Sequence, residues 1–126
     1  MGKEIIFTDR APAPQGAYSQ AIKSGSLIFV SGQIPIDMST GIITAEGITK
    51  ETRVIFDNMS AILEAAGSSL DKVIKLTVYL KRIEDIKFVN DVMEEKFTSE
   101  KPARAAVEVL NLPKNISVEI DAIAEA

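Results

Sequence analysis

Two side chains near the C-terminal end of the chain could together bind and hydrolyse a small acid. Arg104 lies at the start of an expected strand, and Glu119 lies inside the next expected strand. An arginine presents a planar fork of donors that fits a carboxylate with two parallel hydrogen bonds. A glutamate in an otherwise apolar strand can position or deprotonate a water molecule. The pair therefore predicts a minimal hydrolytic site for a small carboxylic acid.

Each of these two residues also has a purely structural interpretation. Arg104 can form a surface ion pair with Glu108, because such pairs are common and contribute little. Glu119 can lie on the solvated face of its strand, as Asp121 can two residues later, since polar and apolar residues alternate along half-buried strands. The residue types alone leave both interpretations open.

Several short motifs give the chain a resemblance to a known family. In order and spacing they resemble the RidA family, also called the YjgF/YER057c/UK114 family, from about Phe7 to Ala124. The resemblance implies one domain over residues 1–126, an α+β fold similar to chorismate mutase, and a homotrimer with a cleft between each pair of subunits. The motifs are Gly16-Ala17-Tyr18-Ser19-Gln20-Ala21, Phe29-Val30-Ser31-Gly32-Gln33-Ile34, Thr77-Val78-Tyr79-Leu80, Asn90, Pro102-Ala103-Arg104 and Leu112-Pro113.

The resemblance also implies an activity. Family members hydrolyse reactive 2-imino acids, such as 2-iminobutyrate and 2-iminopropionate, to 2-oxo acids and ammonia. Arg104 would hold the carboxylate of the substrate, and Gly32 would contact the same carboxylate through its backbone. Glu119 would position or deprotonate the attacking water, whereas Asp121 matches no family site residue and is interpreted as structural.

The resemblance assigns roles to three further residues. Tyr18 would cover the ligand, although Ala17 stands where the family usually has proline and a core or interface role is open to Tyr18 as well. Asn90 would line the pocket, but solvent exposure explains an asparagine within a helix equally well. Many family members carry cysteine at the position of Ala106, so only the backbone carbonyl is available there and a thiol mechanism is excluded.

Composition excludes several classes of protein. The chain has 126 residues, of which 46% are hydrophobic and 25% charged, as expected for one soluble globular domain. It contains no cysteine and no histidine, which removes disulfides, a thiolate nucleophile, a histidine base and the ordinary zinc sites. We therefore expect a site without metal or cofactor. No signal peptide or membrane span is recognisable, so cytoplasmic localisation is expected.

Two other functions remain as alternatives to imine hydrolysis. The same residues could form a module that binds a small 2-oxo or imino acid without catalysis. Some members of the family have been described as ribonucleases or translation inhibitors. The net charge of −4 and the absence of histidine weigh against that role, because nucleic-acid binders need clustered basic residues.

Periodicity and turn residues predict six strands and two helices. A first helix is expected from an N-cap at Thr49 to Gly67, and a second begins near Asp85. A four-residue turn at 23–26 and a polar loop at 37–47 interrupt the early strands. The expected strands cover residues 5–7, 18–22, 27–31, 73–80, 102–109 and 118–124.

The apolar stripes of the two helices predict how the elements pack. Both stripes are interpreted as core, so both helices are expected on one face of a single mixed sheet of about six strands. The other face would be solvated or half-buried against another subunit. The stripes are Ile55, Met59 and Ile62 in the first helix and Val89, Met93 and Phe97 in the second, and the polar residues expected on the other face are Glu108, Ser117, Glu119 and Asp121.

Overall fold

The computed structural model describes residues 2–44 and 46–126 of the chain. Short 3-10 turns at Leu70–Lys72, Ile83–Asp85 and Pro113–Asn115 connect some of its elements. The helices and strands are β1 (Lys3–Ile6), β2 (Ala21–Ser24), β3 (Leu27–Gln33), β4 (Ile36–Asp37), β5 (Ile42–Ile43), α1 (Ile48–Ala65), β6 (Val73–Leu80), α2 (Ile86–Lys96), β7 (Ala103–Glu108) and β8 (Val118–Glu125).

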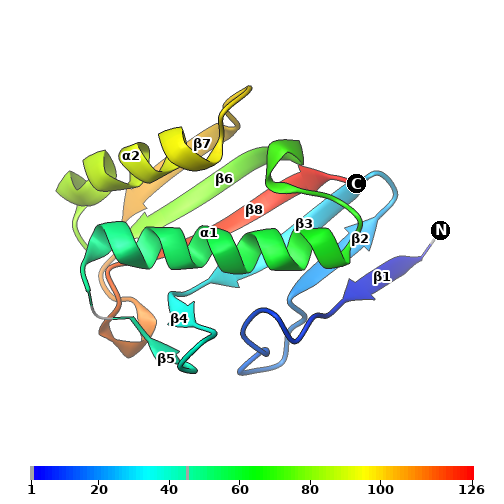
Figure 1. Cartoon of the computed structure of the whole chain (residues 1–126), viewed down its shortest axis with the longest axis horizontal. Coiled ribbons are helices and arrows are strands. Elements are labelled where there is room, and N and C mark those ends of the chain that lie inside the picture. Colours follow the sequence, from blue (N-terminus) through cyan, green and yellow to red (C-terminus); the bar gives the residue numbers. More distant parts are fainter. Residues whose placement is uncertain (1, 45) are drawn as a thin grey trace.

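Six of the strands form one mixed sheet in the order β1-β2-β3-β8-β6-β7. β6 and β7 are parallel, and the other neighbouring pairs are antiparallel. The C-terminal strand β8 is thus inserted between β3 and β6. Both helices lie on the same side of the sheet (Figure 1). The predicted α+β class, the six-stranded sheet and the placement of the helices are confirmed.

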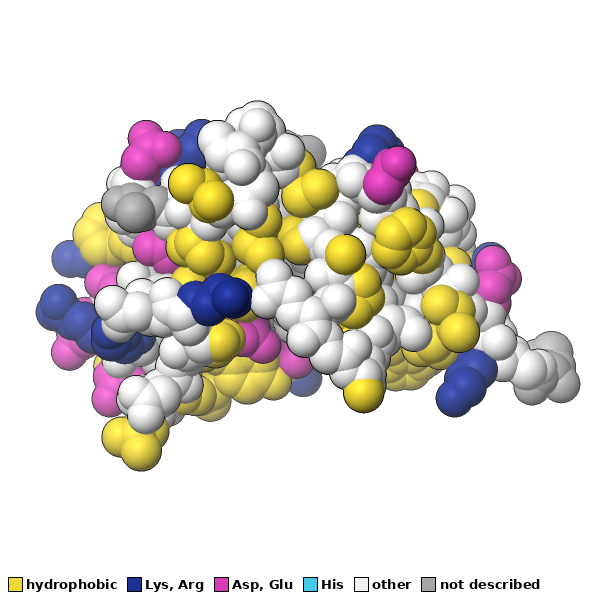
Figure 2. Space-filling model, turned by 90° about the horizontal axis from the view of Figure 1, so that it is seen from below, with side chains coloured by type: hydrophobic (Ala, Val, Ile, Leu, Met, Phe, Trp, Pro, Cys, Tyr) yellow, Lys and Arg dark blue, Asp and Glu magenta, His cyan; other side chains and the backbone are white. Residues whose placement is uncertain are grey.

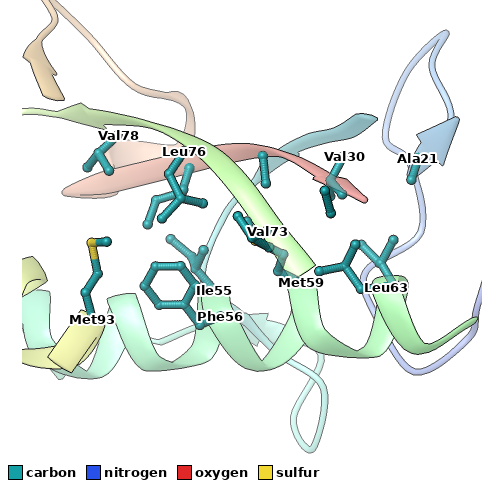
Figure 3. Packing of buried hydrophobic residues seen from close by; sticks show 14 of the residues in the cluster. Ala21, Val30, Ile55, Phe56, Met59, Leu63, Val73, Leu76, Val78 and Met93 are labelled. Atoms are coloured by element: carbon teal, nitrogen blue, oxygen red, sulfur yellow. The ribbon is translucent and has the colours of Figure 1, made fainter. Parts of the chain in front are cut away.

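The core lies between this sheet and the two helices. Ile55, Met59 and Ile62 of α1 are fully buried, as their helical spacing predicted. Side chains of α1 and α2 point toward the strands from the helical side in Figure 3. The ring of Phe56 packs edge-on against that of Phe97 with centroids 5.3 Å apart. Each fully buried side chain of this size stabilises the fold by about 1.5–3 kcal/mol.

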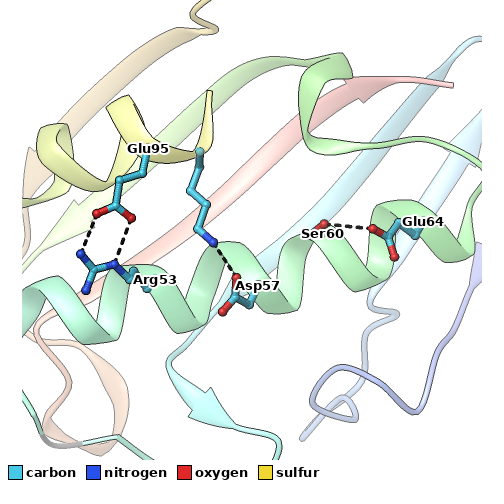
Figure 4. Close-up of polar contacts among 6 residues, drawn as sticks. Arg53, Asp57, Ser60, Glu64 and Glu95 are labelled. Carbon is cyan, nitrogen blue, oxygen red and sulfur yellow. Dashed lines mark hydrogen bonds and ion pairs between the residues drawn. The ribbon is translucent and has the colours of Figure 1, made fainter. Parts of the chain in front are cut away.

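Polar contacts on the outer surface link the two helices. Arg53 donates two hydrogen bonds, of 3.0 and 2.6 Å, to the carboxylate of Glu95. The Lys96 ammonium donates one of 2.8 Å to Asp57 (Figure 4). Exposed pairs of this kind contribute about 0–1 kcal/mol each, so the apolar core determines the packing. Over residues 2–44 and 46–126, neither helix is long and apolar enough to cross a membrane.

The early hairpin differs from its prediction at both ends. β2 begins at Ala21 instead of residue 18 and continues to Ser24, which pairs with Leu27. The turn therefore has two residues, not four. Gly25 adopts φ +59°, a conformation that tight hairpin turns require and that glycine adopts without strain. Before β2 the backbone bends, because the amide of Tyr18 donates to the carbonyl of Gly16 at 2.9 Å.

The segment before α1 also differs from its prediction. Part of the expected loop at 37–47 forms a small hairpin in which β4 pairs with β5, while Ala45 lies outside the described residues. The helix begins at Ile48, one residue before the predicted N-cap Thr49. Gly47 occupies the cap position at φ +103°, and its carbonyl accepts the amide of Glu51 at 3.0 Å. Glycine tolerates this backbone conformation and so determines where the helix starts.

One residue predicted for the open face lies on the other side. Glu108 pairs with Leu80, whose side chain is buried under the helices. Its carboxylate accepts the backbone amide of Ile83 at 2.9 Å. The prediction failed because the register of a parallel edge strand depends on its neighbour, and β7 alone carries no strong alternation. Glu119 and Asp121 do occupy the open face, since the intervening Ile120 is buried in the core.

Candidate functional site

Three of the predicted site residues, Tyr18, Gly32 and Glu119, line one cavity of about 420 Å³. The 3-10 turn at Pro113–Asn115 closes part of it. Figure 2 views the molecule from the side on which this turn, β4 and β5 lie in Figure 1, and hydrophobic side chains gather across the middle of that face. The other lining residues are Gln15, Ser31, Ile34, Pro113 and Lys114.

An irregularity in β3 makes room for the Glu119 carboxylate. Val30 pairs with Ala122 and Gln33 with Ile120, so two residues of β3 lie opposite one residue of β8. Such a bulge bends the strand and is common beside functional sites. Gly32 is one of the two residues, and a Cβ atom placed there would overlap Oε2 of Glu119. Any larger residue at this position would therefore displace the Glu119 carboxylate.

The surroundings of Glu119 change its acidity. Its side chain is half-buried on the open face of the sheet, directly beside Gly32. Burial raises the pKa of the Glu119 carboxyl, and the negative charge of Asp121 raises it further. A carboxylate with a raised pKa is a stronger base than an ordinary glutamate, which suits it to accept a proton from water. This combination distinguishes Glu119 from a residue on a freely solvated strand face.

The hydroxyl of Tyr18 bonds to its own loop, and the backbone that follows Tyr18 bonds to β3. The hydroxyl of Tyr18 accepts the backbone amide of Gln15 at 3.2 Å. Ser31 Oγ donates to the carbonyl of Ser19 at 2.6 Å, and the Ser31 amide donates to the carbonyl of Gln20 at 2.9 Å. The ring itself is 51% exposed at the mouth of the cavity. The backbone around Tyr18 is thus fixed, and its side chain is open toward solvent at the cavity.

The buried amide of Gln20 braces the first part of this loop. Gln20 is 2% exposed, and its Oε1 accepts the amide of Thr8 at 2.8 Å. Its Nε2 donates to the carbonyls of Thr8 and Pro12, both at 3.0 Å. A fully satisfied buried amide gives a unique loop conformation, because a shifted loop would leave these groups unpaired. The loop that presents Tyr18 is therefore rigid at its base.

The loop before β8 contains unusual backbone geometry at the cavity wall. Lys114 and Asn115 have φ of +56° and +57°, which costs energy for residues other than glycine. The conformation is stabilised from outside the loop. Lys81 Nζ donates to Asn115 Oδ1 at 2.6 Å, and Oε1 of the buried Glu51 accepts the amide of Ser117 at 2.9 Å. These contacts place Lys114 at the wall of the Glu119 cavity.

Two further predicted site residues, Arg104 and Asn90, line a second cavity of about 400 Å³, whereas Ala106 is not among the residues that line either cavity. Nη1 of Arg104 donates to Oδ1 of Asn90, and the same nitrogen lies 3.5 Å from the sulfur of Met93. Asn90 therefore orients the guanidinium, and the exposed remainder of the fork can receive an anion. Ala106 is partly buried and packs against the core. Glu94, Lys101 and Pro102 complete the lining.

The two cavities lie on different sides of the sheet. Arg104 pairs with Leu76, which is buried on the helical side. Glu119 pairs with Tyr79 on the open side. Within one copy of the chain, the structure brings Tyr18 and Gly32 to Glu119 and brings Asn90 to Arg104. The predicted carboxylate clamp and the predicted water-activating group thus line two separate cavities of one copy.

Sequence reasoning assigned no site role to several residues that line these cavities, among them Ser31, Lys114 and Met93. Ser31 and Lys114 line the Glu119 cavity, and Met93 lines the Arg104 cavity. Met93 was interpreted as core, and at 7% exposure it is core, but its sulfur also faces Arg104. For Ser31 the sequence did contain a signal, because this residue directly precedes Gly32. For Lys114 it contained none, because lysine does not favour a left-handed backbone conformation.

Comparisons with known proteins give the family. The sequence model of the family described as Endoribonuclease L-PSP matches residues 8–126. A RutC family protein of Pyrococcus horikoshii is 56% identical over 97% of both chains. A 2-iminobutanoate/2-iminopropanoate deaminase of Salmonella typhimurium is 43% identical over 96% of both chains.

A solved structure agrees with this assignment. The crystal structure of a conserved Rid family protein of Yersinia pestis superposes with a TM-score of 0.96 at 40% identity, covering 99% of this chain and 100% of that chain. The fold agrees with that of the solved structure, and the match covers nearly the whole chain. The motifs also contain residues that line both cavities. The chain therefore belongs to the RidA family, as its motifs predicted.

Proposed function

We propose that the protein hydrolyses reactive 2-imino acids to 2-oxo acids and ammonia. The family includes proteins named as imine deaminases, at 41% and 43% identity to this chain. The observation that carries the proposal is the half-buried Glu119 carboxylate, whose pKa is raised, at the wall of a cavity large enough for a small acid. The exposed guanidinium of Arg104, oriented by Asn90, supplies the group that a substrate carboxylate needs.

Hydrolysis of an imine needs few protein groups. The carbon of a protonated imine is electrophilic, so a water held beside it can form the new C–O bond while Glu119 accepts a proton from that water. The protonated Glu119 then gives this proton to the nitrogen of the carbinolamine. As the C–N bond breaks and ammonia leaves, the Glu119 carboxylate takes the hydroxyl proton, so that the carbonyl of the 2-oxo acid forms. That proton finally leaves with the ammonia as ammonium, which restores the carboxylate. Orientation of the substrate by two hydrogen bonds from Arg104 accounts for the rest of the catalysis.

The separation of the two cavities supports a site shared between copies. The open face of the sheet carries half-exposed apolar side chains, among them Phe29 at 44% and Val107 at 41% exposure. A second copy packed there would cover them and could bring its Arg104 to the Glu119 cavity of the first. We propose a homotrimer, in keeping with the family resemblance, in which each of the three clefts combines Glu119 of one copy with Arg104 of the next.

Ammonia release tests the proposed reaction. A threonine dehydratase supplies 2-iminobutyrate, and addition of this protein is expected to accelerate release of ammonia, with the same rate in EDTA. An unchanged rate of imine decay at micromolar protein would contradict the proposal. Tight binding of 2-oxobutyrate without acceleration would instead favour the non-catalytic binding module, and cleavage of RNA would favour the ribonuclease role that the description of the family names.

Mixed oligomers test the shared site. Arg104→Ala and Glu119→Gln copies are each expected to be nearly inactive, but co-expression of the two should restore activity. With random assembly, roughly a quarter of the clefts combine an intact Arg104 with an intact Glu119. Recovery of about that fraction of wild-type activity, together with a trimer in light scattering, is the expected result. A monomer, or a trimer without recovery, would rule out a site shared in this way.

A further inference from the structure

A second carboxylate on the open face lies close to Glu119. Glu119 and Asp121 are two residues apart in β8 and point to the same side. Two residues of extended strand span roughly 7 Å, which is the distance between their backbones. Tyr79 is the cross-strand partner of Glu119, whereas Thr77 is the partner of Asp121. The phenol of Tyr79 nevertheless reaches diagonally along β8, and its hydroxyl donates to Oδ2 of Asp121 at 2.9 Å. Tyr79 therefore lies opposite Glu119 in the sheet and at the same time holds the carboxylate of Asp121.

We propose that Asp121, held by Tyr79, is a positioning residue that acts through Glu119 by keeping a fixed negative charge beside it. The inference rests on the proposed function, because it gives Asp121 a part in the activation of water by Glu119. Asp121 does not touch the substrate in this arrangement. Its effect is electrostatic and depends on the direction in which Tyr79 holds it.

The hydrogen bond fixes where this charge lies. A phenol that donates to one carboxylate oxygen holds the carboxylate in one direction. The same bond, with partial burial, raises the pKa of Tyr79, so the phenol remains a donor at neutral pH. A negative charge beside Glu119 disfavours a second one there, and the raised pKa of Glu119 includes this contribution after that of burial. Asp121 thereby makes Glu119 a stronger base.

The other described groups around Glu119 do not supply this effect. From β6 the open face receives Lys75 and Tyr79, and the Pro113–Asn115 turn contributes Lys114 to the cavity wall. Both lysines are cations, as is Arg104 of the next copy in the proposed trimer, and a cation lowers the pKa of a nearby carboxyl. From β3 the neighbours are Ser31 and Gly32, which carry no charge. Burial and the negative charge of Asp121 therefore raise the pKa of Glu119.

The direct test is a titration of Glu119 that does not depend on activity. Carbon NMR of the glutamate carboxyls, with the Glu119 signal assigned through Glu119→Gln, gives its midpoint in each variant. Asp121→Asn is expected to shift this midpoint to lower pH. Asp57→Asn, which removes an exposed aspartate of α1 on the helical side of the sheet, serves as the matched control and should leave it unchanged. An unshifted Glu119 in Asp121→Asn overturns the proposal, whether or not the protein proves to be a deaminase.

Kinetics then connect the charge to catalysis. The acid limb of kcat/KM is expected to move to lower pH in Asp121→Asn, with a lower plateau because the base is weaker. Tyr79→Phe retains the charge of Asp121 but no longer holds it in place, so the limb should move to lower pH by less than in Asp121→Asn. An unmoved limb in Tyr79→Phe would contradict the part that the proposal gives to Tyr79. A titration shift of Glu119 in a protein without imine hydrolysis would contradict the proposed function alone.

Discussion

Replacing Arg104 with alanine is expected to remove binding of 2-oxobutyrate and to lower kcat/KM by on the order of 10²–10³. The substrate carboxylate would lose its charged partner and the two hydrogen bonds that orient it. Arg104→Lys should recover little of the loss, because an ammonium cannot reproduce the planar fork. Isothermal titration calorimetry with 2-oxobutyrate measures the binding, and the dehydratase-coupled assay measures the rate.

The contacts of Arg104 provide the controls for this result. Its side chain is exposed at the sheet edge and bonds to Asn90, so its removal should change the melting temperature little. Arg82→Ala removes another exposed arginine, one whose contact is a 3.7 Å pair with Glu84, and should leave both binding and rate unchanged. Wild-type affinity for 2-oxobutyrate in Arg104→Ala would show that the carboxylate is bound elsewhere.

Replacing Glu119 with glutamine is expected to preserve binding of 2-oxobutyrate and to slow turnover by on the order of 10²–10⁴, the usual contribution of a general base. Glutamine retains the shape beside Gly32 but cannot accept a proton from water. The contrast with Arg104→Ala, which loses binding first, separates the two roles. Stopped-flow measurement of imine decay at saturating substrate gives the turnover rate. Normal turnover would mean that Glu119 is only a strand-face residue and that water is activated otherwise, for instance by the carbonyl of Ala106.

The raised pKa of Glu119 also predicts in which direction Glu119→Gln changes the stability of the fold. Because folding raises the pKa of Glu119, the protonated side chain contributes stability that is lost as the pH rises through the folded-state pKa. At neutral pH this contribution is already lost, and the neutral glutamine avoids the cost of burying a charge. The melting temperature of Glu119→Gln at neutral pH should therefore equal or exceed that of the wild type. A slow but stable variant shows that the loss of rate is chemical and not a loss of folding.

Local patterns in the sequence predicted most of the elements. The strand at 73–80 has its predicted bounds, since Leu76, Val78 and Leu80 alternate strictly with more polar residues. The stripes of both helices were buried as predicted, because a helix in a small domain must cover its apolar side. The boundaries around Gly25 and Gly47 were missed. Those glycines adopt left-handed backbone conformations, and from sequence alone their neighbours were equally good candidates for the turn and the cap.

For the candidate site, too, the sequence predicted one part and the tertiary structure decided the other. The family motifs and the residue types predicted which groups could act, namely Arg104, Glu119, Tyr18, Gly32 and Asn90. Tertiary structure decided which of them meet.

Strand β8 enters the sheet between β3 and β6, and this non-local pairing brings Glu119 to Gly32 and Tyr79. The register of β7 on β6 turns Arg104 to the helical side instead. Side chains alternate between the two faces of a strand, so the register of each pairing decides the face that a residue occupies. That register depends on the partner strand, which lies far away in the sequence.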